Sequence, residues 1–98
     1  MVTVYALYNP RHDKIYVGQT VNLDERVGQH NDHDFCHTYT SRFDGRWVVI
    51  YTERVTNRNE ALVREKQLKS YRGREFIRKQ ISLVALRQLA EVGRMRYH

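Results

Sequence analysis

The apolar positions of this chain form short strand-like runs, followed by longer stretches in which they recur every three to four residues. Residues 2–8 are rich in β-branched and aromatic side chains, and residues 15–17 form a second such run after the turn-forming residues 9–13. Two runs joined by so short a connection predict an antiparallel hairpin. Residues 47–51 are apolar throughout, a pattern that predicts a third strand in a central or well-covered position.

Two capping patterns predict where helices begin. Asn22 precedes Glu25 by three positions, and Asn57 precedes Glu60 by the same spacing. At these positions each asparagine can accept a hydrogen bond from the backbone of the first helical turn. We therefore expect a short helix that ends near Asn31 and a longer helix that follows Asn57.

The last part of the chain carries an apolar face at helical spacing. After a helical stretch near residues 74–79, Ser82 is a candidate cap for another helix and Gly93 is a candidate stop. We expect this tail, residues 81–98, to close over the core or to contact a second copy or a larger protein partner. Its apolar face consists of Leu83, Leu86, Leu89 and Ala90.

Together these elements predict one α/β domain over residues 1–80 in the order β-β-α-β-α-α, followed by the tail. The fold class is a small three-stranded, mostly antiparallel sheet flanked by helices. No run approaches the roughly 18 apolar residues of a membrane span, and the first residues lack the pattern of a signal peptide. Cys36 is the single cysteine and cannot form an intrachain disulfide. We expect a cytoplasmic protein that does not contact membranes.

The excess of positive over negative charge lies entirely in the second half of the chain. Residues 1–50 hold five Lys or Arg and six Asp or Glu, whereas residues 51–98 hold twelve and five. Such an asymmetry fits a polyanion such as nucleic acid, although a solvated basic helix surface would give the same count. We expect the phosphate-binding cations among Lys66, Lys69, Arg72 and Arg74.

Two tyrosines are candidates for chemistry on the predicted hairpin. Alternation along the strands places Tyr5 on one face, and Tyr16 and Gly18 share a face on the second strand. Hairpin pairing can bring the two rings together, although strand tyrosines commonly serve only as packing. A positioned phenol can accept a proton from water when cations stabilise its ionised form. Gly18 leaves room for a phosphate to approach the strand.

The helix after Asn22 offers a cation and an imidazole on neighbouring positions of one edge. Arg26 and His30 are four residues apart and adjoin the apolar pair Leu23 and Val27. The guanidinium fork of an arginine matches two phosphate oxygens, and His30 could orient a water molecule. A surface ion pair or a charge at the end of a helix is the simpler explanation.

Glu65 is the residue that fits its local pattern least well. It follows Ala61 and Leu62 and precedes Leu68 at helical spacing, so its carboxylate points where the helix is otherwise apolar. Such a group needs a cation or hydrogen-bond donors. A buried ion pair, for example with Arg26, and a divalent metal ion both satisfy that need.

A cluster of possible soft-metal ligands lies between the first helix and the third strand. The spacing of its residues lacks the second ligand pair of a zinc knuckle, so a structural zinc ion is not the preferred interpretation. His37 is instead expected near the active site, on a mobile loop. The cluster consists of His30, His33, Cys36 and His37.

Four segments together resemble the GIY-YIG nuclease superfamily, in its small stand-alone bacterial type. Thr3-Val4-Tyr5 stands where Gly-Ile-Tyr is usual, and Tyr16-Val17-Gly18 is a common variant of the second motif. The segment from Arg26 to Asn31 resembles the family's Arg-x-x-x-His-Asn pattern. The segment from Glu60 to Lys69 resembles the corresponding helix of the stand-alone type.

This resemblance implies a Mg²⁺-dependent DNA endonuclease, with Mn²⁺ able to replace Mg²⁺. It implies that Tyr5 acts as general base or orients the attacking water and that Tyr16 supports it. Arg26 would hold the scissile phosphate, with His30 nearby, and Glu65 would bind the metal ion that stabilises the leaving 3′ oxygen. The expected substrate is structured or branched DNA, in repair or recombination.

Two other functions fit the same residues. A non-catalytic nucleic-acid-binding module would keep the fold and the basic half without using Tyr5, Arg26 or Glu65. An assembly subunit would use the leucine-bearing tail. The five-residue set Tyr5, Tyr16, Arg26, His30 and Glu65 favours the enzyme, because a binding module has little need of an inward carboxylate.

Overall fold

The computed structural model describes residues 1–32 and 39–96, with side chains described as far as residue 83. Its sheet has the order β2-β1-β3, and both neighbouring pairs are antiparallel. The predicted α/β class with a small antiparallel sheet is therefore confirmed. The elements are β1 (Val2–Asn9), β2 (Lys14–Thr20), α1 (Leu23–Asn31), a 3-10 turn (Thr40–Arg42), β3 (Val48–Val55), α2 (Arg58–Lys69) and α3 (Tyr71–Arg96).

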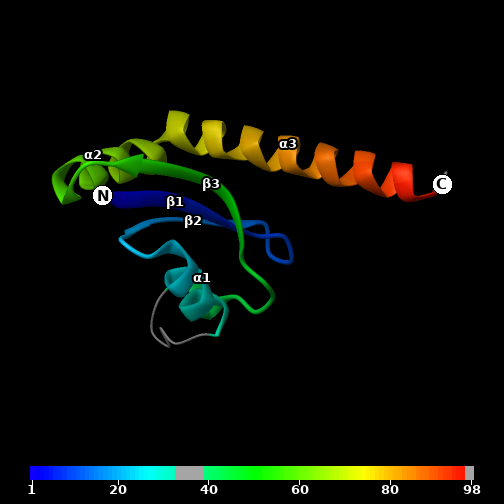
Figure 1. Cartoon of the computed structure of the whole chain (residues 1–98), viewed down its shortest axis with the longest axis horizontal. Coiled ribbons are helices and arrows are strands. Elements are labelled where there is room, and N and C mark those ends of the chain that lie inside the picture. Colours follow the sequence, from blue (N-terminus) through cyan, green and yellow to red (C-terminus); the bar gives the residue numbers. More distant parts are fainter. Residues whose placement is uncertain (33–38, 97–98) are drawn as a thin grey trace.

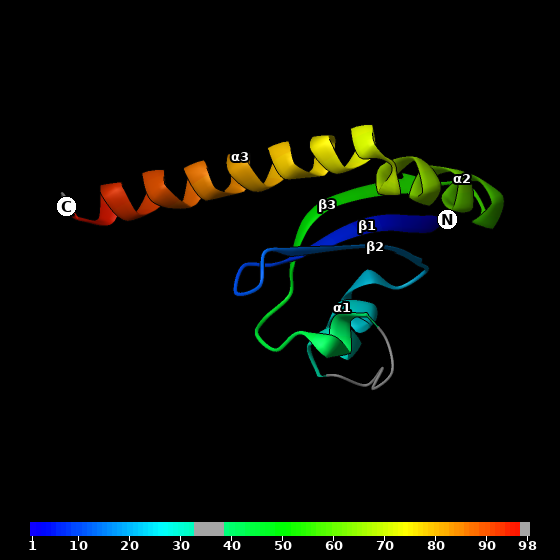
Figure 2. The ribbon, with the colours of Figure 1, turned by 180° about the vertical axis from the view of Figure 1, so that it is seen from behind.

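The sheet is covered on both faces (Figures 1 and 2). Helix α1 lies against one face, and α2 with the first part of α3 lies against the other. Alternation along β1 supplies both cores, because Val4 and Ala6 pack toward α2 and α3 whereas Tyr5 and Leu7 pack toward α1. All four side chains are fully buried. The predicted division of β1 between two faces is confirmed.

Strand β3 is an edge strand, and the prediction of a central position was wrong. The central strand is β1, which pairs with β2 on one side and β3 on the other. Ala6 faces Tyr51 whereas Leu7 faces Val49, so Ile50 is an extra residue that forms a β-bulge. The apolar run at residues 47–51 therefore does not require a strand with both faces buried. Trp47 is a buried residue of the preceding loop, and the bulge places the extra residue Ile50 in the core.

The predicted capping residues begin the first two helices. The side chain of Asn22 accepts a hydrogen bond from the backbone N–H of Glu25, and Asn57 does the same for Glu60. Glu60 in turn accepts from the backbone N–H of Thr56 at 3.0 Å, which completes a reciprocal cap. Glu60 is thus accounted for by the helix terminus alone.

Helix α3 is continuous from Tyr71 to Arg96, so the separate helix predicted after Ser82 was wrong. Ser82 lies inside the helix and its hydroxyl donates to the carbonyl of Arg78. Gly93 does not end the helix, because an isolated glycine costs only about 1 kcal/mol. The helix runs past the sheet (Figure 1). No helix among the described residues is long and apolar enough to cross a membrane.

Candidate active site

The hairpin brings the two tyrosines together on the face that α1 covers. Tyr5 pairs with Gly18 in the register of β1 and β2, and the ring centroids of Tyr5 and Tyr16 are 6.1 Å apart. Tyr5 is fully buried, whereas Tyr16 is partly exposed at the edge of the sheet. The Tyr5 hydroxyl therefore has a fixed position, and Tyr16 connects it to the surface.

Gly18 leaves the space that the Tyr5 hydroxyl occupies. A Cβ atom at this position would lie 2.8 Å from both the Tyr5 Oη and the Tyr16 Cε1. Tyr5 is packed on all sides and cannot turn away, so the methyl group would displace its hydroxyl. The backbone of Gly18 has the ordinary extended conformation of a strand. Glycine is needed here because the side chains of Tyr5 and Tyr16 lie too close to leave room for a Cβ atom.

Gly18→Ala is expected to lower the rate of any cleavage that depends on Tyr5 by about a hundredfold, because small misplacements of a reacting group cost that much. Single-turnover cleavage measures the loss, and denaturant unfolding verifies that the variant folds. Combining it with Tyr5→Phe, which removes the nearest clashing atom, should add little further loss of rate. Fully additive losses would show that Gly18 acts by another route.

Helix α1 adds His30 to the two tyrosines. The His30 Nε2 lies 2.9 Å from the Tyr5 Oη, and the His30 Nδ1 lies 2.8 Å from the Thr40 Oγ1. The imidazole also packs against the Tyr16 ring, with 4.9 Å between centroids. His30 is therefore buried and held at both nitrogens, in a line that runs from Tyr5 through the imidazole to Thr40.

Arg26 sets the charge around this line. Burial and the adjacent Arg26 guanidinium lower the pKa of His30 to about 4, so the imidazole is neutral at pH 7. Burial, and next to it the neighbouring Tyr16, raises the pKa of the Tyr5 phenol. The charge of Arg26 and its hydrogen bond to the phenol act in the opposite direction. Tyr5 is thus a protonated phenol beside a neutral imidazole and a cation.

The lowered pKa of His30 gives the fold a specific acid sensitivity. The imidazole binds a proton below about pH 6.5 in the unfolded chain but only near pH 4 in the folded protein. The free energy of unfolding is therefore highest above pH 6.5 and falls progressively as the pH is lowered toward 4. The expected loss is on the order of 3 kcal/mol. An NMR titration of the His30 ring should show a largely neutral imidazole at pH 5. A midpoint near 6.5 would contradict the burial argument.

Glu65 lies on the opposite side of the sheet, beside β2. The Gln19 Nε2 donates to one carboxylate oxygen and the Lys69 Nζ to the other, each at 2.9 Å. The side chain is 18% exposed, so it lies at the margin of the core rather than within it. The predicted apolar stripe holds for Ala61 and Leu68, which are buried, but Leu62 is 58% exposed.

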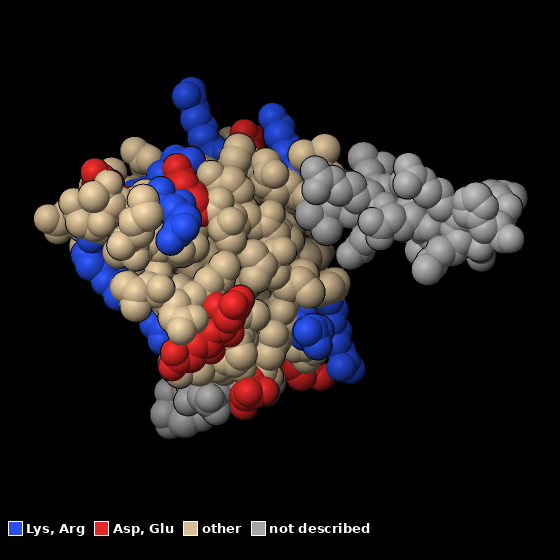
Figure 3. Space-filling view, in the orientation of Figure 1, with Lys and Arg blue, Asp and Glu red and all other residues tan. Residues whose placement is uncertain are grey.

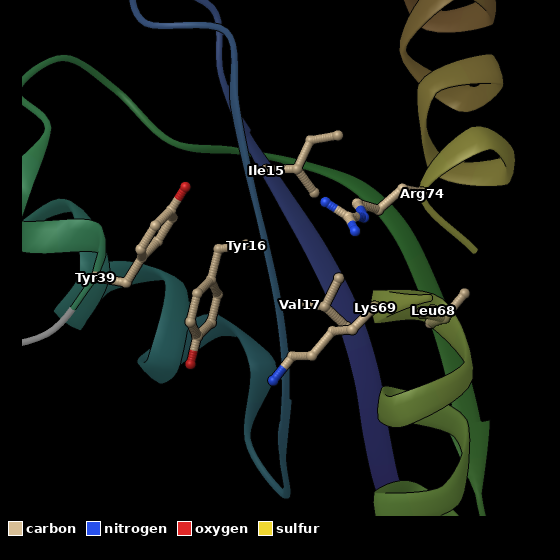
Figure 4. Close-up of a pocket in the computed structure, with 7 residues that line it drawn as sticks. All are labelled: Ile15, Tyr16, Val17, Tyr39, Leu68, Lys69 and Arg74. Atoms are coloured by element: carbon tan, nitrogen blue, oxygen red, sulfur yellow. The ribbon is translucent and has the colours of Figure 1, made fainter. Parts of the chain in front are cut away.

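Tyr16 and the ion-pair partner of Glu65 line one pocket at the free edge of β2 (Figure 4). The pocket has a volume of about 420 Å³, with Tyr16 on one side and Lys69, the ion-pair partner of Glu65, on the other. Tyr16 faces the α1 side, whereas Gln19, which holds Glu65, faces the α2 side. The structure therefore groups four of the candidates on the α1 face, and Gln19 of β2 connects the edge strand to Glu65 on the other face.

The surroundings of Glu65 fit a divalent cation. Mg²⁺ commonly binds to one or two carboxylates and keeps water molecules for the substrate phosphate. Lys69 already neutralises this carboxylate, which shows that the position accepts positive charge. Because the lysine is 56% exposed, its ion pair is weak and can be exchanged for a metal ion. Within residues 1–32 and 39–83, no group of three or more His, Cys, Asp or Glu side chains is placed to hold a metal ion, so Glu65 would bind the ion together with water molecules.

The predicted phosphate-binding cations separate into two groups. Lys69 and Arg74 line the pocket at β2, whereas Arg72 lies in a different hollow beside Gln67 and Phe76. Lys66 is exposed on α2. Figure 3 shows basic side chains projecting from the layer of α2 and α3. Of the four, only Lys69 and Arg74 are positioned beside Tyr16.

The predicted metal cluster of the loop lies largely outside the described residues, which omit His33, Cys36 and His37. Its remaining member, His30, has both ring nitrogens engaged by Tyr5 and Thr40.

Two residues at the site were not found by sequence reasoning. Thr40 fixes one nitrogen of His30 from an irregular segment that carries no motif. Gln19 directly follows the second motif and points to the opposite face from Gly18, so strand alternation alone could have placed it toward α2.

Comparison with known protein families identifies one match. The model of the GIY-YIG catalytic domain matches residues 1–78, which include every residue of the five-residue set. No curated protein and no solved structure gave a significant match to the chain.

Proposed function

Because the chain belongs to the GIY-YIG family, whose catalytic domains are nucleases, we propose that it is a divalent-metal-dependent endonuclease acting on DNA. The observation that carries the proposal is the hydrogen-bonded line from Tyr5 through His30 to Thr40, with Arg26 beside it. Titratable groups with pKa values shifted by burial and by a specific charged neighbour are typical of catalytic sites, which favours the enzyme over a binding module.

Arg26 would bind two non-bridging oxygens of the scissile phosphate through its guanidinium fork. The negative phosphate would then offset the charge that disfavours protonation of His30. Substrate binding would in this way prepare the imidazole to accept a proton, which explains why a cation is placed next to it.

Tyr5 would transfer the proton of the attacking water. Its raised pKa means that it enters the reaction as a neutral phenol. As the water oxygen bonds to phosphorus, the phenol oxygen takes the water proton and passes its own proton to the Nε2 of His30. The Nδ1 proton of His30 would be held by Thr40. Tyr16 would position the water from the surface side.

The bond from phosphorus to the 3′ oxygen would break, and its electron pair would stay on that oxygen, which takes a proton from solvent. The products are a 5′ phosphate and a 3′ hydroxyl. Glu65 would hold the metal ion, for which we propose Mg²⁺ with Mn²⁺ as a substitute, and the bound ion supplies charge stabilisation for the leaving oxygen. We propose structured or branched DNA as substrate, in repair or recombination.

Incubation of the purified protein with branched, nicked and single-stranded DNA, with Mg²⁺ or with EDTA, tests the proposal. We expect cleavage only with the metal ion, and ends that DNA ligase can rejoin, because a 5′ phosphate and a 3′ hydroxyl are its substrates. Binding that weakens with salt but is never followed by cleavage would instead favour the non-catalytic module.

A further inference from the structure

The pocket at the edge of β2 has the composition of a nucleotide site. Its floor is apolar, formed by Ile15, Val17 and Leu68, and its two sides carry different chemistry. Tyr16 and Tyr39 present aromatic rings from the α1 side, while Lys69 and Arg74 reach toward the strand from α2 and α3 (Figure 4). The volume of about 420 Å³ lies in the range of small-molecule sites.

Tyr39 is held in place but keeps part of its ring in solvent. It packs edge-on against Phe43 with 5.2 Å between centroids, and Phe43 packs in turn against the buried Trp47. Its ring is within 23° of parallel to that of Tyr16, at 6.4 Å. The side chain is nevertheless 40% exposed. A fixed, exposed aromatic surface beside two cations is the arrangement on which unstacked bases bind.

We propose that this pocket binds one unpaired nucleotide of the DNA substrate next to the scissile phosphate. Its base stacks on Tyr39, and its phosphate contacts Arg74 and Lys69. This proposal rests on the proposed function and adds that the pocket selects DNA substrates that contain an unpaired base. In intact duplex the faces of each base are covered by its neighbours, so an aromatic wall can stack only on a base that has left the helix.

Arg74 supports a phosphate contact at this place. Among the residues that the structure describes, no side chain forms an ion pair with its guanidinium. The Lys69 ammonium is shared with Glu65, so it is near both the candidate metal ligand and the pocket. A nucleotide held here would thus lie close to Tyr16.

The test uses DNA with 2-aminopurine, a fluorescent base that aromatic stacking quenches, in the unpaired part of a flap. Binding is measured with EDTA present, so that no cleavage is needed for the signal. We expect quenching by the wild-type protein and by Tyr39→Trp, which keeps an aromatic surface. Tyr39→Ala should abolish the quenching and weaken binding of the flap about tenfold.

Tyr71→Ala is the matched control, because Tyr71 is 74% exposed and lies outside this pocket. The Tyr71→Ala protein should quench the 2-aminopurine fluorescence as strongly as the wild-type protein does. Thermal unfolding verifies that Tyr39→Ala folds, and rescue by Tyr39→Trp separates stacking from packing against Phe43. Unchanged quenching in Tyr39→Ala, or equal quenching of a fully paired duplex, would overturn the proposal. Quenching without metal-dependent cleavage would instead reject the nuclease and leave the nucleotide site standing.

Discussion

Glu65→Gln is expected to lower the rate of metal-dependent DNA cleavage by about a thousandfold. The substitution keeps the size of the side chain and a carbonyl oxygen for Gln19, but it removes the negative charge that a divalent ion requires. It also removes the ion pair with Lys69, which is exposed and adds little to stability. Single-turnover cleavage with Mg²⁺ measures the effect, and thermal unfolding should show a nearly unchanged midpoint.

Glu60→Gln is the matched control, since it changes a glutamate on the same helix whose function is to cap the helix terminus. Glutamine can replace glutamate in that role, so cleavage should remain close to wild type. Mn²⁺ binding, followed by electron paramagnetic resonance, should be weakened by Glu65→Gln alone. Equal Mn²⁺ affinity in both variants would mean that Glu65 is not the metal ligand.

Gly73→Ala is expected to cost more stability than any other glycine substitution in the described residues, at least about 3 kcal/mol. A Cβ atom at Gly73 would overlap the backbone of Gln67 and Leu68, because α3 starts almost directly on the end of α2. Ser70 forms the corner and accepts a hydrogen bond from the Gly73 N–H. Backbone atoms cannot yield as the end of a side chain can, so the two helices would have to separate.

Gly28→Ala provides the comparison for stability. Gly28 lies within α1 and no atom lies within 4 Å of a Cβ added there, so this substitution should stabilise by up to about 1 kcal/mol through helix propensity. Urea unfolding of the two variants measures the contrast. A Gly73→Ala protein as stable as wild type would show that the turn between α2 and α3 has another shape in solution.

Local patterns predicted those parts of the fold that local energetics determine. The caps at Asn22 and Asn57 and the two-faced alternation of β1 follow from side-chain geometry within a few residues. The edge position of β3 could not be predicted in this way, because an apolar run has the same composition in a central strand as in an edge strand that carries a bulge. The bulge at Ile50 depends on pairing with Ala6 and Leu7, which are distant in sequence.

The sequence was enough to name the candidate residues, but it did not predict the contacts that they make. Arg26 and His30 follow from helical spacing, but the bond from His30 to Tyr5 requires the crossing of α1 over the sheet. The partners of Glu65 depend in the same way on how α2 lies beside β2. The unbroken α3 was missed because Ser82 is a common cap and equally a tolerated interior residue.

The order in which these parts leave the ribosome has a consequence for the cell. Tyr5, Tyr16 and Gly18 belong to a hairpin whose contacts are local, and such contacts form early. Glu65 lies on α2, which can dock only after β3 has paired with β1. A nascent chain therefore acquires the paired tyrosines before it has Glu65, the proposed metal ligand. Under the proposed function, a polypeptide that ends before α2 would lack Glu65 and would therefore not cleave DNA.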